Sequence, residues 1–148
     1  MNVLVWLVEG VWEAAVDAAA RHAPPDARIT LLHAADPALP DDVRGAFTGL
    51  LGRGHPDPSA ALSALTRAAE EDLLAAAAAR LARPATAVAL PGPGERTVVA
   101  ACAELGADLL IVARDGDPGH PGPHSLGHGT RFVVDHAPCA VLLVWPAV

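Results

Sequence analysis

The sequence contains no lysine, so its positive charge rests on ten arginines spread from Arg21 to Arg131. Seventeen acidic residues outweigh them and give a formal net charge of −7. Aromatic residues make up only 3% of the chain. Neither a basic stripe that could follow a phosphate backbone nor interleaved aromatic residues that could stack on bases is present. We therefore expect no nucleic-acid partner.

Cysteines and long apolar runs are also scarce. Cys102 and Cys139 are the only cysteines, and without a CxxC spacing or an obvious redox partner we expect two ordinary buried thiols. No apolar stretch approaches the roughly 20 residues that cross a bilayer. The start, MNVLVWLVEG, lacks the basic leader and cleavage site of a secretory signal. These absences predict a cytoplasmic protein with no membrane partner.

The chain is rich in apolar residues, at 52% of its 148 positions, and we expect one globular domain over residues 1–148. Short continuous apolar runs predict buried strands at Val3–Val8, Ile29–Ala34, Thr86–Leu90, Asp108–Ala113 and Ala140–Trp145. Helical patterns lie between them at Trp12–His22, Ser59–Ala82, Glu95–Leu105 and Thr130–His136, with Asp41–Leu51 as a further candidate. This alternation predicts an α/β fold, a single doubly wound domain with a parallel sheet and helices on both faces.

A stretch rich in glycine, proline and histidine (residues 116–130, GDPGHPGPHSLGHGT) links the fourth predicted strand to the last predicted helix. Ligands of such sheets bind outside the carboxyl ends of the strands. Glycines let the backbone approach a ligand closely, and the amides at a helix start favour an anion. The candidates for an anion site are Gly116, Gly119, Gly127, Gly129 and Thr130. A flexible surface connection is the alternative that this composition leaves open.

The charges around this stretch act in both directions. Arg114 and Arg131 flank it and could bind phosphate, although surface arginines that only aid solubility would look the same. Asp115 and Asp117 would repel a polyphosphate unless a magnesium ion lay between them.

Histidines and tryptophans complete the candidate residues. The histidines at positions 120, 124 and 128 recur every four residues, but the surrounding prolines and glycines oppose the helix that would align them for a metal. We expect them to contact phosphate or water. Trp6, Trp12 and Trp145 are expected to pack as buried aromatics, and Trp12 follows the first strand closely enough to line or block an adenine pocket. His33 is expected to be a structural histidine.

The glycine spacing resembles that of a known family. Gly116, two residues, Gly119, nine residues and then Gly129-Thr130 match G-x2-G-x9-G-[ST], which resembles the nucleotide-binding pattern of the universal stress protein family. The segments VLVWLV, ITLLHAAD, PGPGERTVVAACAELGADLLIVAR and HAPCAVLLV are similar to other parts of that family. The resemblance therefore covers nearly the whole chain.

The resemblance implies a five-stranded sheet in the order 3-2-1-4-5 and a homodimer that forms through the C-terminal strand. That strand would lie at the sheet edge, where an apolar segment favours pairing with its copy. In one branch of the family, ATP is held at the ends of strands one and four. By that resemblance, Gly116, Gly119, Gly129 and Thr130 would hold the phosphates and ribose, and the backbone of Ala34 would meet adenine.

The first predicted strand departs from the family pattern at the expected ligand contact. Val8 stands where ATP-binding members usually carry an aspartate, and Glu9 follows it. Two hypotheses therefore stay open. One is an ATP-binding regulatory domain of the stress response, with Mg²⁺ and an unknown protein partner, and the other is a module of the same fold that dimerises and binds proteins without nucleotide. No catalytic residue can be placed, so we expect at most a weak ATPase.

Overall fold

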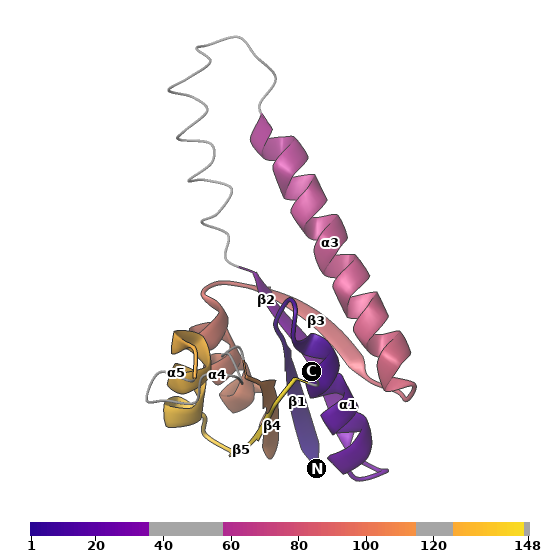
Figure 1. The fold of residues 1–148 in the computed structure, drawn as a ribbon, viewed down its shortest axis with the longest axis vertical. Coiled ribbons are helices and arrows are strands. Elements are labelled where there is room, and N and C mark those ends of the chain that lie inside the picture. The colour runs from indigo at the N-terminus through magenta and orange to yellow at the C-terminus, as the bar shows by residue number, and fades with distance from the viewer. Residues whose placement is uncertain (36–57, 115–125, 147–148) are drawn as a thin grey trace.

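The computed structural model describes residues 1–35, 58–114 and 126–146 of the chain. In these residues a single parallel sheet has the spatial order β3-β2-β1-β4-β5 (Figure 1). Its strands are β1 (Asn2–Leu7), β2 (Arg28–Ala35), β3 (Thr86–Pro91), β4 (Leu109–Ala113) and β5 (Ala140–Val144). The α/β fold and the strand order 3-2-1-4-5 are therefore confirmed.

Helices cover both faces of the sheet (Figure 1). Those on one face are α1 (Trp12–His22) and α3 (Pro58–Leu81), and those on the other are α4 (Gly94–Glu104) and α5 (His128–His136). The expected helices agree with these bounds to within two residues. The further helix expected at Asp41–Leu51 lies outside the described residues. None of the helices that the structure describes combines the length and apolar character needed to cross a membrane.

The sheet separates two apolar cores because successive side chains of a strand point to opposite faces. In β1, Val3, Val5 and Leu7 pack toward α1 and α3, whereas Leu4 and Trp6 pack toward α4 and α5. All five are at most 7% exposed. The central position of β1, paired with β2 and β4 on its two sides, explains this burial on both faces.

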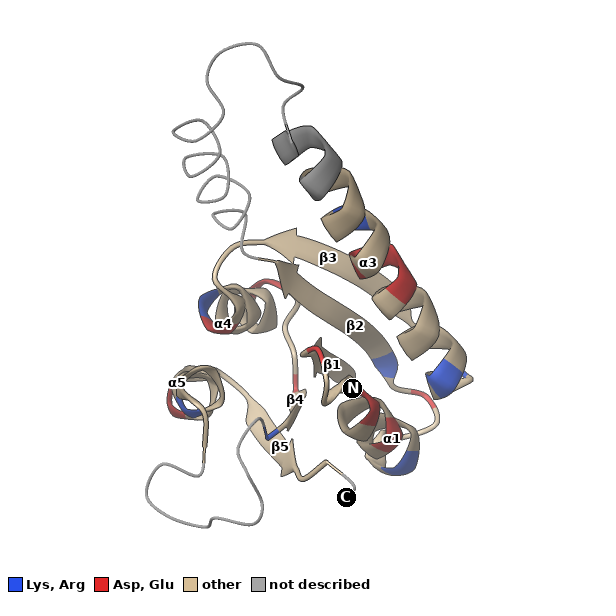
Figure 2. Cartoon of the chain, turned by 45° about the horizontal axis from the view of Figure 1, so that its top comes forward, with Lys and Arg blue, Asp and Glu red and all other residues tan. Residues whose placement is uncertain are grey.

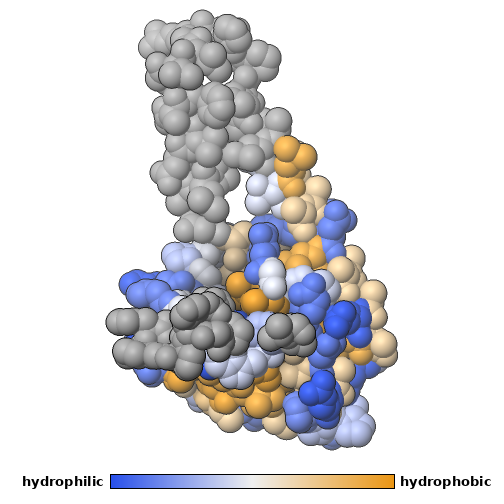
Figure 3. Space-filling model, viewed as in Figure 1, coloured by the Kyte–Doolittle hydropathy of each residue, from blue (hydrophilic) through white to orange (hydrophobic). Residues whose placement is uncertain are grey.

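α3 extends past the sheet, as Figure 1 shows. Its C-terminal half packs on the core through buried Ala77 and Leu81, whereas Leu65 remains 67% exposed. Apolar surface is visible along this helix in Figure 3. Arg80 ties α3 to α1, since its Nε and Nη2 donate to the two carboxylate oxygens of Asp17 at 2.6 and 2.7 Å.

The residues after α3 also hold the end of α1. The Arg83 guanidinium donates to three consecutive backbone carbonyls there, those of Ala23, Pro24 and Pro25, at 3.2, 2.7 and 2.8 Å. These residues directly follow α1, so the Arg83 cation lies at the carboxyl end of the helix, where positive charge is favoured by the helix dipole.

The two cysteines lie together, which the sequence did not reveal. Cys102 of α4 is buried and Cys139, just before β5, is half-buried, and both belong to the core under α4 and α5. The two thiols are neighbours in this core, close enough for Cys139 to contribute to the raised pKa of Cys102. Cys102 is thus the buried thiol that was expected, whereas Cys139 is only half-buried, and packing in this core brings the two together although they are far apart in the chain.

Candidate functional site

The carboxyl ends of β1 and β4 lie side by side at the same end of the sheet, the carboxyl edge, since Val5 pairs with Ile111 in parallel register. The chain turns sharply after β1, where the Val11 amide donates to the Val8 carbonyl at 3.2 Å and Gly10 adopts φ +80°. α5 begins beside the last residues of β1, because a Cβ atom placed on Gly129 would lie 3.5 Å from the Trp6 ring. The edge expected to bind a ligand is thus formed by β1, β4 and the first turn of α5.

The expected phosphate-binding residues are only partly described. Gly127, Gly129 and Thr130 come together at the start of α5, with Gly127 at the N-cap. Gly127 has no side chain with which to cap the helix. Thr130 is only 2% exposed, so its side chain is buried in the first turn. Gly116 and Gly119 lie outside the described residues, as do the aspartates at 115 and 117 and the histidines at 120 and 124.

The residues expected near ribose and adenine lie at the ends of β1 and β2. Val8 is partly buried against the core under α4 and α5, and Glu9 is exposed. Ala34 lies within β2 and pairs with Leu90 of β3. His33 is a structural histidine, as expected, because its Nδ1 donates to the Leu7 carbonyl at 3.1 Å and joins the ends of the two strands.

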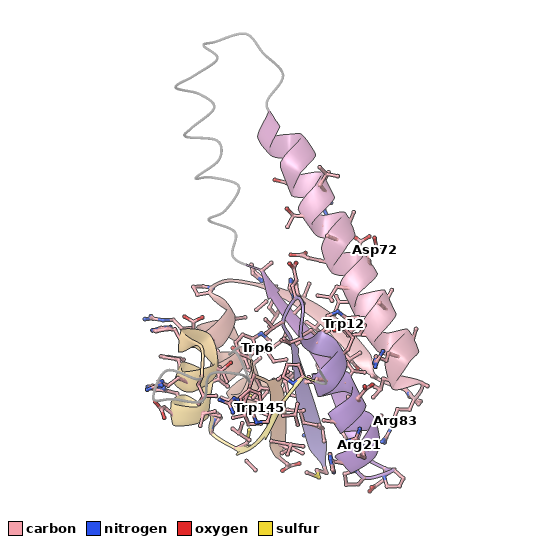
Figure 4. All side chains as sticks on the ribbon, viewed as in Figure 1. Trp6, Trp12, Arg21, Asp72, Arg83 and Trp145 are labelled. Carbon is pink, nitrogen blue, oxygen red and sulfur yellow. The ribbon has the colours of Figure 1, made fainter. Side chains whose placement is uncertain are left out.

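Trp6, not Trp12, reaches the start of α5. Trp12 packs on the α1 and α3 face, away from α5, whereas Trp6 lies on the α4 and α5 face (Figure 4). A Cβ atom placed on Gly94 would lie 3.2 Å from Trp6 Cζ2, and one placed on Gly129 would lie 3.5 Å from Trp6 Cη2. The indole, 7% exposed, is therefore held between the first turns of α4 and α5.

The Glu95 carboxylate also lies beside Gly129. The Oε2 atom of Glu95 would lie 3.8 Å from the same Cβ atom placed on Gly129. A negative charge is stabilised near the start of a helix by the partial positive charge of its first amides. Glu95 thus supplies an anion where a phosphate would bind, and a ligand phosphate would be repelled by it.

The two flanking arginines have different surroundings. Arg114 follows β4, and its guanidinium carbon lies 3.2 Å from the ring centroid of Trp145, a cation–π contact at the end of β5. Trp145 is 44% exposed, so the expectation that it is buried was wrong, because it follows the last residue of an edge strand. Arg131 is exposed on the first turn of α5. Arg131 therefore lies on the first turn of α5 itself, whereas Arg114 lies at the end of β4.

The described residues contain no group of three histidine, cysteine or acidic side chains arranged to hold a metal ion. What the described part of the edge offers a ligand is main-chain amides, two arginines and one competing carboxylate. This arrangement favours recognition of an anion over catalysis.

The parallel sheet with helices on both faces places the chain among the doubly wound α/β domains, in which ligands bind outside the carboxyl ends of the strands. The sequence profile of the universal stress protein family matches residues 11–144. The chain belongs to the universal stress protein family, as the resemblance of its glycine spacing and closing strand predicted.

Solved structures of the same family share the fold. A universal stress protein in complex with cAMP is 18% identical, with a TM-score of 0.66 over 99% of this chain and 98% of the other. The protein UspA from Lactobacillus plantarum is 25% identical, with a TM-score of 0.63 over 97% of both chains. A family protein from Arabidopsis thaliana with AMP bound is 17% identical, with a TM-score of 0.60 over 100% of this chain and 93% of the other. No curated protein sequence matches the chain.

Proposed function

We propose that this protein binds an adenine nucleotide, ATP with Mg²⁺, at the carboxyl edge of its sheet and acts as a cytoplasmic regulatory domain of the stress response. The observation that carries the proposal is the start of α5, where Gly127 precedes the helix and Gly129 lies beside Trp6 of β1, so that main-chain amides lie at the carboxyl end of the sheet. Two similar structures of the family hold cAMP and AMP, which supports an adenine ligand.

The phosphates would lie at the first turn of α5, where main-chain amides can substitute for the missing lysine. The glycine motif adds Gly116 and Gly119 to this cradle. Arg131 and Arg114 would supply positive charge, the latter by leaving its contact with Trp145. A magnesium ion would offset the repulsion between the phosphates and the Glu95 carboxylate.

The base would lie toward the ends of β1 and β2. The backbone of Ala34 would contact adenine, and Val8 and Glu9 would lie near the ribose, where Glu9 can accept a hydrogen bond from a hydroxyl group. We expect binding without efficient turnover, because no general base is placed to activate water.

The distribution of charge favours a small ligand over nucleic acid. Figure 2 shows basic positions separated over α1, α3, α4, α5, β2 and the end of β4, with acidic positions between them. A protein that follows a nucleic-acid backbone gathers its cations on one surface.

Titration calorimetry with Mg·ATP, AMP and cAMP tests the proposal directly. Arg131→Gln should weaken ATP binding by roughly 10-fold, because a hydrogen bond to a charged group contributes about 1.5–3 kcal/mol and this one is exposed to solvent. The matched control is Arg96→Gln on α4, an exposed arginine whose guanidinium lies 6.0 Å from the Phe132 ring. Equal losses in both variants, or no binding at millimolar ATP with magnesium, would contradict the proposal.

A second function is favoured by the contacts of Trp6. If the indole and Glu95 keep the start of α5 closed to anions, the domain acts instead as a module for dimerisation and protein binding. β5 is an edge strand, and we propose that it pairs with its copy in a homodimer. Trp145→Glu at the end of β5 should then shift the protein from dimer to monomer in sedimentation experiments. A monomeric wild type at micromolar concentration would refute this second function.

A further inference from the structure

The two cysteines of the chain have no role in the proposed nucleotide binding, yet the fold places them in the same core. Cys102 lies in the last turns of α4 and Cys139 directly precedes β5. Both side chains lie in the core under α4 and α5, where the two thiols are close enough for Cys139 to affect the pKa of Cys102. Two neighbouring thiols can be joined by a disulfide when rotation about their side-chain bonds brings their Cβ atoms to about 4 Å.

The two thiols differ in their access to solvent. Cys102 is 1% exposed, whereas Cys139 is half-buried. Burial raises the pKa of the Cys102 thiol to about 12, with a further contribution from the neighbouring Cys139. Cys102 is therefore protonated at neutral pH and protected from reagents in solution, and a dissolved oxidant meets Cys139 first.

We propose that Cys102 and Cys139 form a reversible intramolecular disulfide when the protein meets hydrogen peroxide. In the first step, the Cys139 sulfur attacks one peroxide oxygen, the O–O bond breaks, and Cys139 becomes a sulfenic acid while one water leaves. In the second step, the Cys102 sulfur attacks the Cys139 sulfur, the S–O bond breaks, and the Cys102 proton leaves with that oxygen as a second water. Two thiols and one peroxide thus give one disulfide and two waters.

The disulfide would join α4 to the segment that links α5 to β5. Residues 103–138, which include β4 and α5, would be enclosed in a covalent loop. Closing a loop of this length restricts the unfolded chain, and the expected effect is a Tm higher by roughly 10 °C. Oxidation would stabilise the half of the protein that carries the candidate ligand site.

The experiment compares the reduced and peroxide-treated full-length protein. After treatment, the protein is denatured, alkylated with iodoacetamide and weighed intact. The expected product is a monomer without alkyl groups, about 2 Da lighter than the reduced chain before alkylation. Its Tm should be higher than that of the reduced protein, and dithiothreitol should reverse this rise. The reduced protein should carry two alkyl groups, one on each free cysteine.

The variants Cys102→Ala and Cys139→Ala provide matched controls. Neither should gain thermal stability on treatment with peroxide, and Cys102→Ala should instead trap Cys139 as a sulfenic acid that dimedone labels. The proposal is wrong if oxidised wild type still carries two alkyl groups, if it forms disulfides only between chains, or if its Tm rises equally in the two variants.

Discussion

Two glycines that face the same indole should respond in opposite ways to alanine. A Cβ atom on Gly129 would lie 3.5 Å from Trp6, an ordinary van der Waals distance. Alanine is favoured over glycine by up to about 1 kcal/mol within a helix, so Gly129→Ala should raise the free energy of unfolding by about 0.5 kcal/mol. A Cβ atom on Gly94 would lie only 3.2 Å from the ring, and overpacking a core costs about 1–3 kcal/mol. Gly94→Ala should therefore lower the free energy of unfolding by about 1 kcal/mol.

Urea denaturation followed by far-UV circular dichroism measures both changes without relying on tryptophan emission. A double-mutant cycle identifies the cause, because Trp6→Phe replaces the indole with a ring too short to meet the new methyl group. In the Trp6→Phe background, Gly94→Ala should lose its cost. If Gly94→Ala is as stable as wild type, or if its cost persists in that background, the indole is not held between α4 and α5 as described.

Three further changes test contacts elsewhere in the fold. Arg83→Met should lower the free energy of unfolding by about 1–2 kcal/mol in urea denaturation, because the carbonyls of Ala23 and Pro25 lose the guanidinium donor, whereas that of Pro24 keeps the Ala27 amide. The hydrogen bond from Arg80 lowers the pKa of Asp17 below its usual 3.8. The ionised Asp17 carboxylate therefore stabilises the fold fully above pH 3.8, and this stabilisation is lost as the pH falls through the lowered pKa. Asp17→Asn should remove that acid-dependent part of a Tm-against-pH curve. Burial raises the pKa of Cys102 from 9.0 to about 12, so wild type should lose stability as the pH rises from about 9 toward 12, and Cys102→Ala should not show this fall.

The fold could be predicted from the sequence because it depends on local patterns. Continuous apolar runs predicted buried strands, and the helices between them predicted parallel pairing, since a right-handed crossover covers each face. The strand order itself came from the family resemblance. Boundaries were less accurate where a strand end depends on a distant partner. Asp108, for example, was expected in β4, but its carboxylate accepts a hydrogen bond from the Asn2 amide at 2.6 Å, and the strand begins one residue later.

For the candidate site, only the position of the backbone could be predicted from the sequence, and not the side chains around it. Glycine spacing indicated that main-chain amides of α5 gather at the sheet edge, because glycine acts through the chain itself. It gave no information on which side chain would fill the space beside them. Trp6 is one apolar residue of an apolar strand in the sequence, and Glu95 is one acidic residue of a helix start. Their meeting at Gly129 depends on how α4 and α5 pack together, which no local pattern specifies.

The same packing of α4 against its neighbours produces both features that the sequence did not reveal. The first turn of α4 brings Gly94 and Glu95 to Trp6 and the start of α5, and a later turn brings Cys102 to Cys139. A disulfide at the second contact would restrict the motion of α4 relative to α5 at the first. If nucleotide entry requires Trp6 or Glu95 to move, the oxidised protein should bind nucleotide more weakly than the reduced protein. By thermodynamic linkage, bound nucleotide should then disfavour formation of the disulfide by the same factor as oxidation weakens nucleotide binding. Equal ATP affinity in the reduced and oxidised protein would show that the start of α5 accepts its ligand without displacing α4.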